Sequence, residues 1–148
     1  DIDLVEMINQ TNGEFEEKFS EKGLSIISNA PSNGVKIRAD GRHLWRVLEN
    51  LYNNAFKYAA KNSRVYIDIL ADGKTATFII KNISENPLNM RPEELTERFV
   101  RGDVSRTTEG SGLGLSIAKS LTMLQGGKFD IIIDGDLFKV QIKFEKVE

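Results

Sequence analysis

The sequence predicts an α+β fold in which one mixed sheet carries helices packed on one face. Four β-like runs pair into two hairpins around short Asp-Gly or Gly-Asp turns, and two strong helical patterns stand apart from them. Strands and helices do not alternate as they would in a doubly wound parallel sheet, so the order of the elements favours α+β.

The first part of the chain predicts two helices with short strands between them. Apolar residues at roughly helical spacing predict a helix over 3–22, which Gly13 interrupts and Gly23 stops. The runs LSIISN and VKIRA predict two short strands. Asp40 is a good N-cap for the longest helix, 41–61. The predicted core stripe of this helix comprises Leu44, Val47, Leu48, Leu51, Ala55 and Ala59.

The second part predicts a hairpin, a long irregular segment, a helix and a second hairpin. RVYIDILAD and KTATFIIKN pair around Asp72-Gly73. Residues 84–111 have no strong period apart from a short helix at PEELTER, and a strong helix then runs from 112 to about 125, where Gly126-Gly127 ends it. FDIIID and LFKVQIKFE close the chain around Gly135-Asp136.

Composition excludes several classes of function. The 148 residues carry 20 Lys+Arg against 22 Asp+Glu, and this net charge of −2 does not indicate a nucleic acid or an acidic membrane surface as partner. The absence of cysteine excludes disulfides, thiolate metal sites and a cysteine nucleophile. The sequence shows no apolar run of membrane-spanning length and no signal peptide. Because it begins at Asp1 rather than Met, we expect a fragment of a larger intracellular protein.

Asparagines gather on one side of the longest predicted helix. Asn50, Asn54 and Lys57 share one narrow sector beside the apolar stripe, so we expect them to be half-buried. Amide oxygens suit a hard cation such as Mg²⁺, and a lysine supplies a positive charge for phosphate. The alternative is a solvated helix face on which asparagine is tolerated.

A glycine-rich turn, GSGLGL at 110–115, opens the second strong helix. Such turns expose backbone N–H groups to phosphates, and the helix dipole favours negative charge there. Leu113 and Leu115 are placed to anchor the turn on the core. The alternative is a flexible loop with an ordinary helix start. The turn does not follow a strand, so a dinucleotide-binding fold is not supported.

Taken together, the two signals resemble the catalytic ATP-binding domain of bacterial sensor histidine kinases. That domain shares a superfamily with DNA gyrase, heat-shock chaperones and MutL-type repair ATPases. The resemblance covers essentially the whole chain, so we expect one domain over 1–148. DGRHLWRV at 40–47 is similar to the lead-in to the N box, ERFVRGD at 97–103 to the F box and GSGLGL to the G2 box. Four residues match the N box itself: Asn50, Asn54, Lys57 and Tyr58.

The resemblance implies a two-layer α/β sandwich with a mobile ATP lid over 84–111. It implies ATP and Mg²⁺ as ligands, with Asn54 on the metal and Asn50 supporting it. Lys57 would pair with phosphate and Tyr58 would lie against adenine. The G2 residues implied to bind nucleotide are Gly110, Ser111, Gly112, Leu113, Gly114 and Leu115.

Within the lid, the resemblance assigns arginines to the phosphates. Arg98, Arg101 and Arg106 could steer them, although a solvated surface is the alternative and the one we favour for Arg106. Phe99 would enter the core when the lid closes, or simply pack there as an ordinary core residue.

Two family motifs differ here. The G1 box normally reads Asp-x-Gly-x-Gly, but this chain has NISEN at 82–86. Asn82 therefore stands where the adenine-reading Asp is expected; its carbonyl can accept from the adenine amino group and its NH₂ can donate to the ring nitrogen. Near the C-terminus, DGDLFKV stands where the family often has Gly-x-Gly-Thr, so the resemblance implies that a water contact to adenine mediated by threonine is lost.

The predicted function is transfer of the γ-phosphoryl group of Mg-ATP to a histidine on a separate dimerisation domain, and from there to a response regulator. His43, the only histidine, reads as a first-turn or surface residue, so we expect the fragment to be inactive without that domain. The resemblance implies a cytoplasmic domain of a membrane-anchored sensor, without membrane or nucleic-acid contacts of its own. Two alternatives remain: a degenerate nucleotide-binding scaffold, motivated by the missing G1 glycines, and an anti-sigma-type protein-serine kinase.

Overall fold

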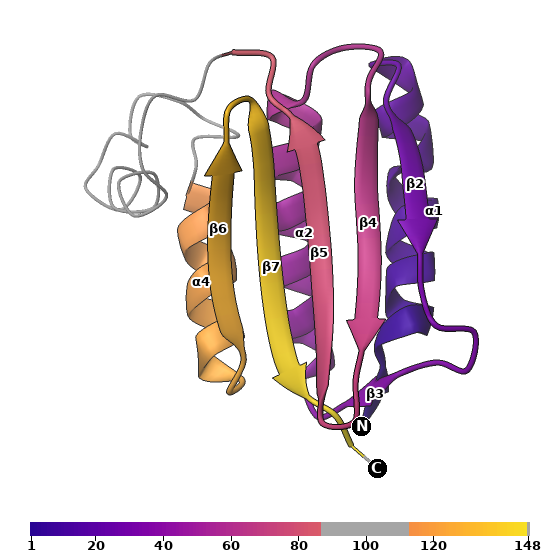
Figure 1. The fold of residues 1–148 in the computed structure, drawn as a ribbon, viewed down its shortest axis with the longest axis vertical. Helices are drawn as coiled ribbons and strands as arrows, with labels where there is room; N and C mark the ends of the chain where they lie inside the picture. The colour runs from indigo at the N-terminus through magenta and orange to yellow at the C-terminus, as the bar shows by residue number, and fades with distance from the viewer. Residues whose placement is uncertain (87–112, 148) are drawn as a thin grey trace.

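A five-stranded mixed sheet forms one layer of the computed structural model, which describes residues 1–86 and 113–147 (Figure 1). The strand order is β2-β4-β5-β7-β6. The pair β2–β4 is parallel and all other neighbours are antiparallel. The strands are β2 (Ser25–Asn29), β4 (Arg64–Ala71), β5 (Thr75–Ile83), β6 (Lys128–Asp134) and β7 (Leu137–Glu145).

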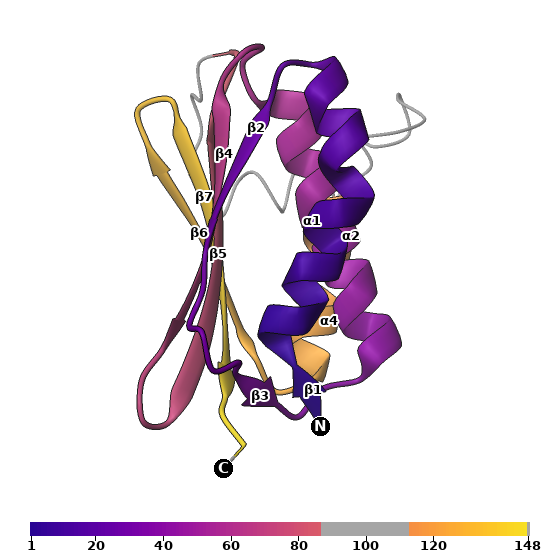
Figure 2. The same ribbon diagram turned by 90° about the vertical axis from the view of Figure 1, so that its right-hand side faces the viewer.

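The described helices are α1 (Leu4–Glu21), α2 (Gly41–Tyr58) and α4 (Leu113–Leu124). All of them lie on the same face of the sheet, and no described helix covers the other face (Figure 2). A small second sheet pairs β1 (Ile2–Asp3) with β3 (Lys36–Ile37). The predicted α+β class, the two hairpins and the single helical layer are confirmed.

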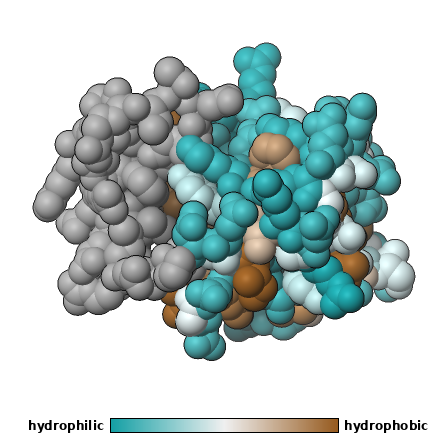
Figure 3. All heavy atoms as spheres, turned by 90° about the horizontal axis from the view of Figure 1, so that it is seen from above, coloured by the Kyte–Doolittle hydropathy of each residue, from teal (hydrophilic) through white to brown (hydrophobic). Residues whose placement is uncertain are grey.

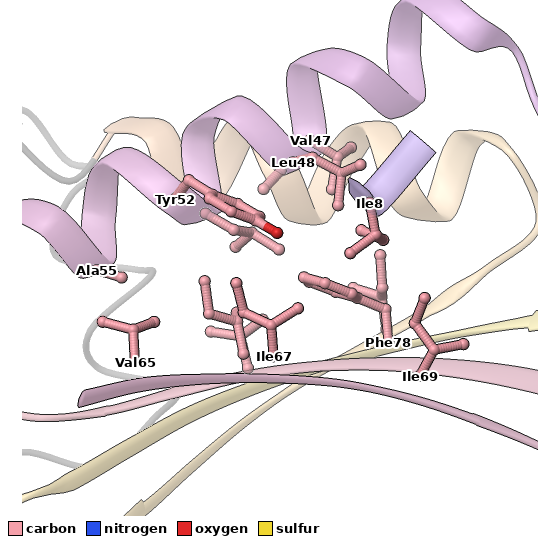
Figure 4. Close-up of a cluster of buried hydrophobic side chains, with 14 of the residues drawn as sticks. Ile8, Val47, Leu48, Tyr52, Ala55, Val65, Ile67, Ile69 and Phe78 are labelled. Carbon is pink, nitrogen blue, oxygen red and sulfur yellow. The ribbon is translucent and has the colours of Figure 1, made fainter. Parts of the chain in front are cut away.

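The core lies between the two layers. Alternate residues of β4, Val65, Ile67 and Ile69, point toward the helices, as strand geometry requires (Figure 4). Every residue of the predicted α2 stripe is buried. The prediction missed Tyr52, which is fully buried and whose hydroxyl donates a hydrogen bond to Asn12 Oδ1 at 2.5 Å. Burial raises the pKa of the Tyr52 phenol well above its ordinary value.

Helix ends follow the capping residues, with some corrections. Asp40 caps α2 as predicted, accepting from the backbone N–H groups of Arg42 and His43 at 2.9 and 3.1 Å. The predicted extension of α2 to residue 61 is wrong, because Ala59 adopts extended backbone and bridges to Ser84. Gly13 does not interrupt α1, since a helix packed against a core tolerates one exposed glycine. Of VKIRA, only Lys36–Ile37 form a strand.

Candidate functional site

The described candidate residues come from three elements that meet toward one end of the molecule. The C-terminal half of α2, the first turn of α4 and the last residues of β5 all lie toward the upper end in Figure 1. Seen from above, the described residues of this end are mostly hydrophilic (Figure 3).

Asn50 meets the start of α4. A Cβ added to Gly114 would lie 3.5 Å from both Cβ and Oδ1 of Asn50, so the first turn of α4 passes directly beside this amide. The Nδ2 of Asn50 is buried and has no hydrogen-bond partner in the described part of the chain. Asn54, one turn further along α2, is half-buried like Asn50. The structure thus places Asn50 of α2 against Gly114 in the first turn of α4.

Asn82 supplies a second buried amide without a partner. It lies on the inner side of β5, in register with Val65 on one side and Phe138 on the other, and is only 3% exposed. Within residues 1–86 and 113–147, nothing accepts a hydrogen bond from its Nδ2. Leaving a buried donor unpaired costs about 1–3 kcal/mol, so both amides are suited to a ligand that brings acceptors.

Lys57 and Tyr58 are the last two residues of α2. Lys57 is exposed, which corrects the expectation of half-burial: the last turn of α2 extends past the first turn of α4 (Figure 1). Its Nζ lies 5.4 Å from the centroid of the Tyr58 ring. Tyr58 is half-buried, and desolvation raises the pKa of its phenol.

The remaining predicted residues are only partly described. Leu113 is the first residue of α4, and Leu115 is 1% exposed and anchors that helix on the core as predicted. The other lid and turn residues lie outside the described residues: Arg98, Phe99, Arg101, Arg106, Gly110, Ser111 and Gly112.

Within the described residues, the side chains available to a metal ion at this site are amides. Among the described residues, no group of three or more His, Cys, Asp or Glu side chains could hold a metal ion. An amide oxygen such as that of Asn54, completed by phosphate and water oxygens, is the kind of ligand set that Mg²⁺ accepts.

Asn53 takes no part in this face. It accepts a hydrogen bond from Lys18 Nζ at 2.8 Å, so its side chain is directed toward α1. His43 lies in the first turn of α2, as the sequence indicated, and is half-buried. No helix among the described residues is both long and apolar enough to cross a membrane.

Comparison with known proteins identifies the architecture. A family model described as histidine kinase-, DNA gyrase B- and HSP90-like ATPase matches residues 39–146. The chain belongs to this ATPase family. A curated relative is the probable sensor protein PcoS of Escherichia coli, 34% identical over 146 residues. That match covers 96% of this chain and 31% of PcoS, so the chain spans about a third of the relative.

Solved structures agree with the family. The nucleotide-free catalytic domain of histidine kinase ThkA superposes with a TM-score of 0.82 at 25% identity, over 98% of this chain and 93% of that one. Full-length ShkA in complex with AMPPNP has a TM-score of 0.76 at 24% identity, over 99% of this chain and 31% of that one, and shows the fold alone. The predicted resemblance to the histidine-kinase branch of the ATPase family is confirmed.

Proposed function

We propose that this chain binds Mg-ATP and presents the γ-phosphoryl group to a histidine of a separate dimerisation domain in the same sensor kinase. The proposal treats residues 1–148 as one catalytic domain that works with this second domain. The phosphoryl group would then pass to a response regulator. The observation that carries the proposal is the pair of buried amide donors without partners in the described residues, Asn50 Nδ2 and Asn82 Nδ2. The first of them lies against Gly114 in the first turn of α4.

The two amides would contact opposite ends of the nucleotide. Asn82 offers one donor and one acceptor to the pairing edge of adenine, with the half-buried ring of Tyr58 against the base. Asn50 and the backbone beside Gly114 face the phosphates, because a glycine there leaves room for close approach. The exposed ammonium of Lys57 pairs with phosphate charge. Arg101, Gly110, Ser111 and Gly112 would complete the phosphate side.

Asn54 would hold Mg²⁺, which when bound neutralises charge on the phosphates during phosphoryl transfer. Asn50 is an amide where gyrase-like relatives use a glutamate to activate water. Since an amide cannot accept a proton near neutral pH, the chain would preserve ATP for transfer rather than hydrolyse it rapidly.

The acceptor histidine would come from outside this chain. His43 is in the first turn of α2, and Lys57 and Tyr58 are in its last, so His43 lies far along the helix from the candidate phosphate site. Together with the sensor-protein relatives, this supports a separate dimerisation domain and a response regulator as partners. The resemblance also supports a position on the cytoplasmic side of a membrane-anchored parent.

Calorimetric titration of the chain with ATP, with and without Mg²⁺, tests the proposal. We expect Mg²⁺ to strengthen binding of ATP, and Asn54→Ala to remove that dependence while leaving the thermal unfolding midpoint unchanged. The absence of binding at millimolar ATP would support the degenerate scaffold instead. Unchanged Mg²⁺ dependence in Asn54→Ala would remove this residue from the metal site.

A phosphotransfer assay separates the two kinase classes. The dimerisation domain of the parent protein, supplied in trans with ATP labelled at the γ position, should acquire acid-labile label at its histidine. Acid-stable label on serine would favour the anti-sigma-type kinase.

A further inference from the structure

The last turn of α2 has every terminal carbonyl occupied. The final four C=O groups of a helix lack partners within the helix and must find them elsewhere. Ala55 O accepts from Ala59 N–H at 2.9 Å, and Tyr58 O accepts from Glu85 N–H at 2.9 Å. The two carbonyls between them, Phe56 O and Lys57 O, both accept from Lys22 Nζ, at 2.6 and 3.0 Å.

Lys22 is itself fixed by the backbone at the end of α1. It is the C-cap of that helix, and its carbonyl accepts from Asn62 N–H at 3.2 Å. Gly23 follows with a φ of +76°, and a Cβ there would come within 2.2 Å of Asn62 Oδ1, so only glycine suits this turn. The Lys22 side chain therefore starts from a fixed point.

The surroundings favour one position for the ammonium. The Nζ of Lys22 also lies 5.5 Å from the centroid of the Phe56 ring, beside an open groove of about 470 Å³ lined in part by Phe56, Lys61 and Asn62. Desolvation lowers the pKa of Lys22, and nearby Lys61 lowers it further, whereas Glu85 opposes this shift. A partly desolvated cation at a helix C-terminus interacts favourably with the helix dipole.

We propose that Lys22 is a positioning residue for the candidate nucleotide site, because it holds the turn of α2 that carries Lys57 and Tyr58. This inference rests on the proposed function. Lys22 touches no candidate ligand atom itself; it acts by fixing the backbone from which the phosphate-pairing ammonium and the adenine-facing ring project.

The chain offers a matched control. Lys18 lies one turn before Lys22 on α1, and its Nζ is 4.7 Å from the same Phe56 ring centroid. It donates to the Asn53 side chain and to no α2 carbonyl in the described part of the chain. Lys18→Met therefore removes the same charge and a similar ring contact while leaving the last turn of α2 held.

The test compares Mg-ATP affinity by calorimetry in Lys22→Met, Lys22→Arg and Lys18→Met. We expect Lys22→Met to weaken binding by about three- to tenfold, the range that loss of a helix-terminal cation supports. Lys22→Arg should recover most of the affinity, because a guanidinium can also donate to two carbonyls. Lys18→Met should bind like the wild type.

A double-mutant cycle with Lys57→Ala adds a readout that general loss of stability would not change. If Lys22 acts through this turn, Lys22→Met should weaken ATP binding less in the Lys57→Ala background than in the wild type. Equal effects in both backgrounds, or equal losses in Lys22→Met and Lys18→Met, would overturn the inference.

Failure of the proposed function would be recognised separately. If the wild type does not bind Mg-ATP, the nucleotide site is refuted, and amide NMR shifts then decide the role of Lys22 alone. Lys22→Met should shift the amide signals of residues 57–60 more than Lys18→Met does. Unshifted signals would refute the positioning role in that case also. Lys22→Gln, which removes the charge and is one atom shorter, replaces Lys22→Met if the Met variant does not fold.

Discussion

Replacing Gly114 by alanine should separate stability from nucleotide binding. The new Cβ would lie 3.5 Å from Asn50 Cβ and Oδ1, which is ordinary van der Waals contact, so the helix can accept it without strain. The same methyl group would occupy the space beside Asn50 that close approach of a phosphate requires. We therefore expect the folded state to tolerate the change and the bound state to suffer from it.

The magnitudes follow from helix propensity and from the contact distance. Alanine is favoured over glycine within a helix by up to about 1 kcal/mol, and less near an end, so unfolding should become no easier. For a chain of this size, about 1 kcal/mol raises the midpoint of thermal unfolding by about 2–4 °C. Loss of one backbone or amide contact to phosphate should weaken Mg-ATP binding by about ten- to a hundredfold, because hydrogen bonds to charged groups contribute about 1.5–3 kcal/mol.

Gly13→Ala is the matched control. Gly13 lies within α1 and is exposed, and a Cβ added there would meet no atom within 4 Å. The same substitution at Gly13 therefore gains helix propensity far from the site. Thermal unfolding by circular dichroism and ATP titration by calorimetry should show both variants at least as stable as the wild type, with affinity lost only in Gly114→Ala. Wild-type affinity in Gly114→Ala would refute the placement of phosphate beside Asn50.

Two further predictions concern a buried and an exposed side chain. Asn82→Ala should reduce the preference for ATP over GTP, measured as a ratio of dissociation constants; an unchanged ratio would mean that the base is recognised elsewhere. Asp72 accepts from Lys74 N–H, Thr75 N–H and the Thr75 hydroxyl at the β4–β5 turn, and these bonds lower its carboxyl pKa from 3.8 to about 2. Its stabilisation should therefore be complete above pH 4 and be lost as pH falls through about 2. The stability difference between wild type and Asp72→Ala in urea should shrink over that interval, and a constant difference would contradict this.

Much of the fold follows from local signals. Hairpin turns at Asp72-Gly73 and Gly135-Asp136, the Asp40 cap and the α2 stripe are each set by residues near one another in sequence, so their patterns predict them. The burial of Tyr52 could not be predicted in this way, because the Asn12 side chain that accepts a hydrogen bond from its hydroxyl comes from α1. The pairing of β2 with β4 likewise depends on how two distant segments pack.

Part of the candidate site could also be predicted from residues that are close together in the sequence. Asn50 and Asn54 lie on adjacent turns of one helix, so the helical period places them on the same face. That Gly114 lies against Asn50 followed only from family resemblance until the structure placed α4 beside α2. Lys22 carried no signal beyond that of a lysine after a helix, and its two carbonyl partners belong to another helix.

The parallel pairing of β2 and β4 has a consequence for the geometry above it. Ser25 is in register with Arg64, so the connecting segments that follow α1 and α2 enter neighbouring strands at the same level. The pairing of these two strands thereby fixes the position of the C-terminal end of α1 relative to the C-terminal end of α2. Removing one residue from either connection would shift one helix end relative to the other. The Lys22 ammonium would then no longer reach both Phe56 O and Lys57 O.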